Sequence, residues 1–290
     1  SKKVVFGDAS NDHYTGYDSI VDDLGNLESG TSTQNLNLLI GKHMLGTDRP
    51  MIHTGTYTQA GGELFVDGVD AGDIDQGATG SCYFLSALAG TANDKSEIIE
   101  DMFEDNGDGT YSVRFYTNGQ ADYVTVDSMM ATKDCGTYLH ANAGGDNGAQ
   151  NIVSDNNELW VALAEKAYAQ LNESGRLGQQ EATNRYGIAG NEGISWGSRT
   201  NGIEHVTGLS ASWGNLNASG NNGVSSAELQ NLVNGDNVVT VGWSGHARSI
   251  IGYDAITGDY DIRNPYDRNH SSLTHAELIG LGASVSWSNS

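Results

Sequence analysis

The sequence has few cysteines, few prolines and few basic side chains for its length of 290 residues. Two cysteines cannot build a disulfide scaffold, and they provide no zinc site. Only 14 Lys and Arg stand against 37 Asp and Glu, which gives a formal net charge of −23. Binding to phosphate backbones or anionic lipid surfaces requires basic side chains, so the balance argues against a nucleic-acid-binding or membrane-surface protein.

Long apolar runs are also missing. No stretch approaches the roughly 18 apolar residues that a spanning helix needs, and the first residues, Ser-Lys-Lys, lack the apolar core of a signal peptide. We therefore expect a soluble protein without a membrane span, and any targeting segment to have been removed or to lie outside this sequence. The abundance of Gly, Asp, Asn and Ser is typical of secreted microbial proteins, which favours an extracellular location over a cytoplasmic one.

Hydrophobic periodicity predicts helices before strands along the chain. Apolar residues at helical spacing predict helices over 81–92 and 157–171. Two alternating segments that flank Asn118-Gly119 predict a hairpin. The last eighty residues are expected to hold mainly antiparallel strands, over 237–243, 246–253, 259–263 and 282–287, with short helices capped by Ser225 and Thr274.

The Gly-rich stretch 187–208 is interpreted as a hinge between these two parts. The fold class predicted is therefore α+β, in two lobes. We expect an N-terminal extension over 1–60, a helix-rich lobe over 61–205 and a β lobe over 206–290. Two lobes with a cleft between them are a common arrangement for an enzyme.

Cys82 stands at the start of the first predicted helix, where unpaired backbone N–H groups favour a thiolate. Gln76 precedes it by six residues, and its side-chain amide would form an oxyanion hole with the Cys82 backbone N–H. Two other interpretations stay open at this point. A cysteine at a helix start is often a small buried hydrophobe, and Cys82 would pair with Cys135 in an oxidising compartment.

A thiol nucleophile needs a base that a third group orients. His246 follows a small-residue turn and enters a strand, and Asn264 ends the next predicted strand. The order Cys, His, Asn is that of papain-like peptidases. In this scheme Asn264 would hold the imidazole of His246 in one tautomer.

The motifs around these residues resemble the calpain family of cysteine proteases. The nucleophile segment is Gln76-Gly-Ala-Thr-Gly-Ser-Cys82-Tyr-Phe-Leu-Ser-Ala, and a second match is Asn157-Glu-Leu-Trp-Val-Ala-Leu-Ala-Glu-Lys-Ala-Tyr-Ala. Gly245-His246-Ala and Arg263-Asn264-Pro265 complete the set. The resemblance extends over residues 61–290. Two tyrosines, Tyr83 and Tyr266, stand where the family usually has tryptophan.

The resemblance implies a papain-like two-lobed fold and an endopeptidase that acts on proteins or peptides. Cys82 would attack the peptide carbonyl, His246 would relay the proton, Asn264 would orient His246, and Gln76 would bind the oxyanion. Two rival functions are an acyltransferase or transglutaminase-like enzyme on the same triad and a catalytically inactive calcium-binding module.

The same resemblance implies one calcium ion in the first lobe. Its ligands would be the backbone carbonyls of Val66 and Gly68 and the carboxylates of Asp73 and Glu158, a set of oxygens that suits calcium. The alternative is that the two acids are ordinary solvated side chains. A second calcium site in the β lobe is predicted to be absent, because the segment from Tyr266 to Thr274, which follows the Asn-Pro motif, is short and Asp267 is its only acid.

Residues 1–60 have no counterpart in the resemblance. One hypothesis is a prosegment that lies in the cleft and is cleaved off, with the enzyme itself as one candidate for the cleaving protease. The other is a linker from a larger secreted protein. His205, close to the hinge, is interpreted as a surface or hinge residue and not as a second base.

Overall fold

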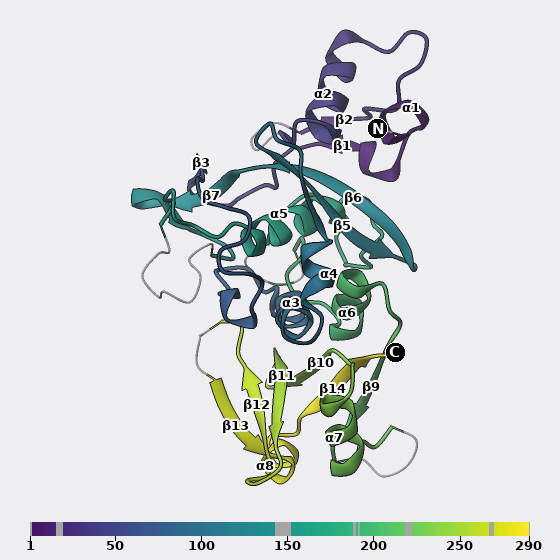
Figure 1. Cartoon of the computed structure of the whole chain (residues 1–290). Coiled ribbons are helices and arrows are strands. Elements are labelled where there is room, and N and C mark those ends of the chain that lie inside the picture. The colour runs from purple at the N-terminus through teal and green to yellow at the C-terminus, as the bar shows by residue number, and fades with distance from the viewer. Residues whose placement is uncertain are drawn as a thin grey trace.

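The computed structural model describes residues 2–15, 20–142, 152–187, 190, 192–217, 222–266 and 270–289. It confirms the predicted α+β fold with two lobes. In Figure 1 the helix-rich lobe lies above the β lobe, and α3 (Cys82–Asp94) lies between them. No helix among the described residues combines the length and the apolar character needed to cross a membrane.

The first lobe is built around two buried helices. α3 is buried from Tyr83 to Ala92, and α5 (Trp160–Asn172) is buried along its whole length. Phe84 of α3 stacks on Tyr168 of α5 with ring centroids 4.0 Å apart. Around them lie α4 (Ser96–Glu100), α6 (Arg199–Thr207), β3 (Thr56–Gln59), β4 (Phe103–Asp105), β5 (Thr110–Thr117), β6 (Gln120–Asp127), β7 (Met129–Lys133), β8 (Thr137–Tyr138) and the 3-10 turns η2 (Ala71–Asp73) and η3 (Asp134–Gly136).

The β lobe is one antiparallel sheet with the strand order β13-β12-β11-β10-β14-β9. α3 and α6 cover one face of this sheet, and two short helices cover the other (Figure 1). The capping boxes predicted at Ser225 and Thr274 are both formed, and each begins one of these helices. The elements are β9 (Ala211–Asn215), α7 (Ser226–Asn234), β10 (Val239–Trp243), β11 (His246–Asp254), β12 (Asp259–Arg263), β13 (His270–Thr274), α8 (His275–Gly280) and β14 (Ser284–Ser288).

The prediction of a hinge over 187–208 is wrong for its second half, which contains α6. Its glycines allow close packing on α3 and do not loosen the chain. A Cβ atom at Gly202 would lie 2.6 Å from the carbonyl oxygen of Tyr83, and one at Gly197 would lie 2.5 Å from the Tyr83 ring. The helix ends at Gly208, which has a left-handed φ of 74°.

The N-terminal segment packs on the first lobe at β6 and the end of α5. Its helices and strands are α1 (Lys2–Phe6), the 3-10 turn η1 (Ala9–Asn11), β1 (His13–Tyr14), β2 (Val21–Asp22) and α2 (Thr33–His43). Lys3 pairs with Asp122 of β6, and the buried Lys42 pairs with Asp48 and Glu173. Figure 1 draws the segment at the top, on the side of the first lobe away from the β lobe, so its described residues do not lie between the lobes.

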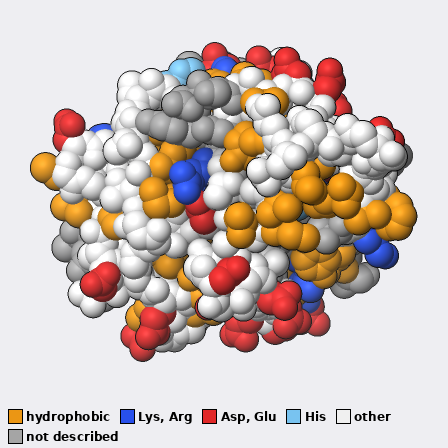
Figure 2. Space-filling view, turned by 90° about the horizontal axis from the view of Figure 1, so that it is seen from above, with side chains coloured by type: hydrophobic (Ala, Val, Ile, Leu, Met, Phe, Trp, Pro, Cys, Tyr) orange, Lys and Arg blue, Asp and Glu red, His pale blue; other side chains and the backbone are white. Residues whose placement is uncertain are grey.

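Figure 2 views the molecule from above and shows acidic side chains around the rim and several groups of hydrophobic side chains, the largest on the right of the view. The large hydrophobic side chains that the N-terminal segment leaves exposed are those of Val5, Phe6, Ile20, Leu27, Met44 and Leu45. The predicted domain boundaries at 60 and 205 stay predictions. In the part of the chain that the structure describes, the buried apolar residues form one cluster in the N-terminal segment, one centred on the first lobe that reaches Val238 and Ala247, and one in the β lobe.

Candidate active site

A cavity of about 300 Å³ lies where the two lobes meet. Cys82 and Tyr83 of α3 line one side of it, and His246 and Ala247 at the start of β11 line another. Arg199, the first residue of α6, also lines the cavity. The structure therefore brings the predicted nucleophile and the predicted base, 164 residues apart in the chain, to one cavity.

The Cys82 sulfur accepts hydrogen bonds from the backbone N–H groups of Ala247 and Tyr83. These donors and the charges of Arg248 and Arg199 favour the thiolate, but burial outweighs them and raises the pKa of the Cys82 thiol above its usual value. The helix start therefore does not by itself bring the pKa of the Cys82 thiol below its usual value. Both Cys82 and Cys135 are free thiols, which excludes the disulfide alternative.

His246 follows a two-residue turn in which Ser244 and Gly245 have φ of 52° and 73°, as a tight β-hairpin requires. Its Nε2 lies 2.7 Å from Oδ1 of Asn264. The same amide oxygen accepts the backbone N–H of Tyr266 at 3.2 Å, which identifies it as an oxygen. Nε2 must therefore carry the proton, and Nδ1 is left to accept one. Burial lowers the pKa of His246, against the effect of the Asn264 hydrogen bond, which raises it.

Gln76 is buried in the loop before α3, and the structure does not place it among the described residues that line the cavity. Its Nε2 donates to the carbonyl of Thr79 at 2.6 Å, and its backbone N–H donates to the carbonyl of Pro265 at 2.7 Å. Its side-chain oxygen has no hydrogen-bond partner among the described residues. The role of Gln76 in an oxyanion hole stays a prediction.

Glu165 of α5 accepts hydrogen bonds from the segment that begins α3 and from the loop at Ala141. Its carboxylate accepts the hydroxyl of Ser81, the residue before Cys82, and the backbone N–H of Ala141 at 2.7 Å. The side chain is fully buried, and burial raises its pKa to about 7. Sequence reasoning treated this residue only as part of a motif, because periodicity places Glu165 on the helix without indicating what it contacts.

The four predicted calcium ligands lie together in the first lobe. Oε1 of Glu158 accepts the backbone N–H of Val66 at 2.8 Å, and Gly68 follows in the same loop with φ of 99°. Asp73 is buried, and its Oδ2 accepts the indole N–H of Trp160 at 3.1 Å. Burial and the nearby carboxylates of Asp73 and Asp67 raise the pKa of Glu158 to about 8. No cluster of three or more His, Cys, Asp or Glu side chains suited to a metal occurs in the part of the chain that the structure describes.

Two further cavity residues were missed by sequence reasoning. Arg199 and Trp196 both come from the stretch interpreted as a hinge. Trp196 has a positive φ of 63°, rare for a residue with a side chain, and its ring lies close to Gly245. Neither residue belongs to a recognisable motif. Tyr266, one of the two tyrosines that stand where the family usually has tryptophan, is 62% exposed.

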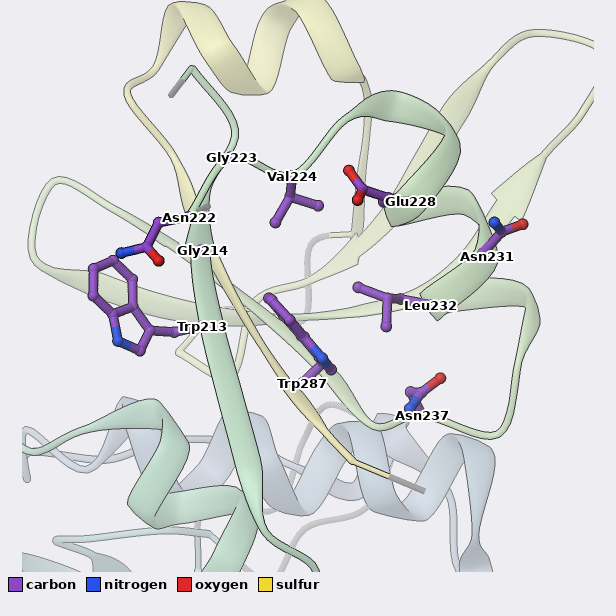
Figure 3. Close-up of a pocket in the computed structure, with 10 residues that line it drawn as sticks. All are labelled: Trp213, Gly214, Asn222, Gly223, Val224, Glu228, Asn231, Leu232, Asn237 and Trp287. Carbon is purple, nitrogen blue, oxygen red and sulfur yellow. The ribbon is translucent and has the colours of Figure 1, made fainter. Parts of the chain in front are cut away.

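A larger cavity of about 430 Å³ lies elsewhere, in the β lobe between β9 and α7 (Figure 3). Trp287, Leu232 and Val224 point toward its centre, whereas Trp213 points away on the other side of β9 (Figure 3). None of the predicted catalytic residues lines it. Size alone therefore does not identify the site, and the predicted catalytic residues Cys82 and His246 line the smaller cavity.

Residues 54–186 match the family model described as calpain family cysteine protease. This range includes Cys82 and α5 but ends before His246. The chain is 35% identical over 136 residues to the calpain-type cysteine protease DEK1 of Zea mays, which is 44% of this chain and 6% of that protein. It is 30% identical over 156 residues to the calpain-2 catalytic subunit of Rattus norvegicus, and 31% identical over 157 residues to the calpain-1 catalytic subunit of Bos taurus; each match covers 52% of this chain and 18% of the relative.

Proposed function

On the premise that this chain contains a calpain-like cysteine protease core, we propose that it is a cysteine endopeptidase that cleaves proteins or peptides with Cys82, His246 and Asn264. The observation that carries the proposal is the cavity shared by Cys82 and His246, together with the 2.7 Å hydrogen bond from His246 Nε2 to Asn264. The chain matches less than a fifth of the length of these relatives, so its activity is inferred from its own site.

The tautomer of His246 decides which atom does the chemistry. Nδ1 takes the thiol proton as the Cys82 sulfur adds to the peptide carbonyl, and it then passes that proton to the leaving amine. The resulting thioester is hydrolysed by a water molecule, whose proton goes to Nδ1 while the acid is released and the thiol is restored. Asn264 accepts from Nε2 throughout and stabilises the imidazolium. The Cys82 backbone N–H and the predicted Gln76 amide are the donors for the oxyanion.

Labelling with a peptide epoxide of the E-64 type tests the proposal directly. We expect one equivalent of probe on Cys82 in the wild type and none in Cys82→Ala, and casein hydrolysis by the wild type alone. Asn264→Ala should retain the thiol but lose at least about tenfold in kcat, because the tautomer is no longer fixed. Labelling without hydrolysis, but with transfer of the acyl group to an added amine, would favour the acyltransferase alternative. No labelling at all would favour an inactive module.

We infer that the first lobe binds a calcium ion. The supporting observation is the pair of buried carboxylates, Asp73 and Glu158, held near each other beside the loop of Val66 and Gly68. Two such acids with backbone carbonyls suit a hard divalent cation, which would neutralise their mutual repulsion. When bound, the ion would act as an electrostatic clamp between this loop and α5.

Thermal unfolding in calcium and in chelator tests this site. Calcium should raise the Tm of the wild type and of Glu104→Gln, an exposed acid of β4, but not that of Glu158→Gln. Equal calcium shifts in all three proteins would overturn the inference. The predicted absence of a second site is not addressed, because Asp267 lies outside the described residues.

Self-processing of the N-terminal segment is a further proposal, and the packing of that segment on β6 does not support a position in the cleft. Comparison of the wild type with Cys82→Ala after incubation with calcium tests it. Equal retention of the segment in both proteins would remove the idea. An extracellular location stays a prediction from composition.

A further inference from the structure

The cavity beside Cys82 has a cation in its wall. The guanidinium of Arg199 donates from Nη2 to the hydroxyl of Ser284 at 2.8 Å and from Nε to that of Ser286 at 3.4 Å, both on β14. A Cβ atom on Gly242 of β10 would lie 1.7 Å from Nη1. The guanidinium therefore fits against the sheet at Gly242, where the Cβ atom of any other residue would collide with it, and the two serines hold it there.

No acid among the residues that the structure describes forms an ion pair with Arg199. No Asp or Glu is among the described residues that line the cavity. Burial lowers the pKa of Arg199 to about 10, so the side chain still carries its charge at pH 7. By contrast, Lys42, Arg49 and Arg176 each contact a carboxylate. A desolvated guanidinium with only hydroxyl partners keeps the capacity to bind an anion.

Arg199 lies close enough to the predicted nucleophile for an anion bound to it to belong to the peptide substrate. A peptide whose carbonyl reaches Cys82 places a neighbouring side chain in this cavity, because Cys82, His246 and Arg199 line the same space. The volume of about 300 Å³ equals that of about ten water molecules, which is enough for one side chain and bridging water. The Trp196 and Trp243 rings, also in the lining, offer apolar surface for the methylene groups of such a side chain.

We propose that Arg199 makes this cavity a specificity subsite for an acidic side chain, Asp or Glu, of the peptide substrate. The inference deepens the proposed function and rests on it. The carboxylate would accept hydrogen bonds from the guanidinium while the peptide lies across Cys82. A single buried charge at the base of a side-chain pocket is a recognised way to select the opposite charge in a substrate.

Paired peptides that differ only in Glu against Gln at one position test the proposal. Each position on either side of the cleaved bond is varied in turn. For wild type we expect kcat/KM to favour Glu by roughly 10-fold to 100-fold at one position only. Arg199→Gln should abolish this preference, and Arg199→Lys should retain part of it. Arg248→Gln is the matched control. Arg248 is near Cys82 and stacks on the Trp243 ring, but Arg248 itself is not among the residues that line the cavity. Its variant should therefore keep the preference for Glu.

Peptide binding to a variant that lacks the catalytic thiol tests the acidic subsite independently of the proposed peptidase activity. The Cys82→Ala variant should bind the Glu peptide roughly 10-fold or more tightly than the Gln peptide, and Cys82→Ala with Arg199→Gln should bind both equally. Equal binding of both peptides by Cys82→Ala would overturn the acidic subsite, even where the wild type cleaves both. A preference that survives Arg199→Gln would overturn it as well. Binding with the expected preference, but no cleavage by the wild type, would refute only the peptidase.

Discussion

Replacement of Arg263 by Met should weaken the contact between the lobes. Arg263 ends β12, is fully buried and reaches into the first lobe. Its Nε donates to the carbonyl of Ala71 at 3.0 Å, and its Nη2 donates to those of Gly72 at 3.1 Å and Ile74 at 2.6 Å. The acceptors belong to η2 and the residue after it, which precede Gln76.

The magnitude follows from the acceptors that the change leaves behind. Met fills much of the space but donates nothing, so three carbonyl oxygens of a buried turn lose a charged donor. Each unsatisfied buried acceptor costs about 1–3 kcal/mol, and relaxation of the turn toward water recovers part of the sum. We therefore expect the free energy of unfolding to fall by about 3–5 kcal/mol. That is a large part of the 5–15 kcal/mol typical of a domain.

Urea unfolding at pH 7, followed by tryptophan fluorescence, measures this change. Arg263→Lys keeps the charge but has a shorter side chain with fewer donors. Its free energy of unfolding should therefore lie between those of the wild type and the Met variant. Catalysis should also suffer in kcat more than in KM, because Arg263 fixes the backbone of Asn264 next to it. A Met variant that loses less than about 1 kcal/mol would show that η2 is satisfied without Arg263, and the reasoning would fail.

Three further predictions concern buried charges. In a Cys135→Ser background, the rate of Cys82 alkylation by iodoacetamide should rise steadily from pH 6 to 9, because burial raises the pKa of the Cys82 thiol. A rate that is already constant from pH 5 to 8 would contradict this and would indicate a thiolate–imidazolium pair. Burial raises the pKa of Glu165 from 4.5 to about 7, so the folded protein holds the extra proton and loses about 3 kcal/mol of stability as the pH rises through that window. Urea unfolding of Glu165→Gln at pH 4.5 and 7.5 should lack this loss, and an identical pH difference in both proteins would contradict it. Lys42→Met leaves Asp48 and Glu173 buried together without a cation, and should cost about 3–5 kcal/mol in the same assay; an unchanged free energy would show that the N-terminal segment is not anchored there.

The elements that sequence predicted well are those whose signal is local. α5 follows from apolar residues at helical spacing, and the β5–β6 hairpin follows from alternation around Asn118-Gly119. α6 escaped prediction because Gly202 within it and Gly197 just before it suggest flexibility when they are considered without their tertiary contacts. Their real function is contact with the Tyr83 backbone and ring, which depends on a helix more than a hundred residues away.

The candidate site divides in the same way. His246 and Asn264 were predictable because each lies in a short sequence motif and both follow Cys82 in the order found in papain-like peptidases. The structure joins the two side chains by a hydrogen bond. Arg199 was not predictable, since a lone arginine in a Gly-rich stretch has no local pattern. Only the sheet register, which sets Gly242 beside Ser284, shows why the side chain lies where it does.

An acidic substrate meets two electrostatic effects of opposite sign in this protein. The net charge of −23 repels it at long range, and this repulsion is screened over about 8 Å at 0.15 M salt. Attraction by Arg199 acts at contact within a cavity, where salt screens it far less. The preference for the Glu peptide over the Gln peptide should therefore grow as NaCl is raised from about 0.02 M to about 0.3 M. Recognition by exposed surface charge would give the reverse, so a preference that declines with salt would place the acidic subsite outside the cavity and refute its assignment to Arg199.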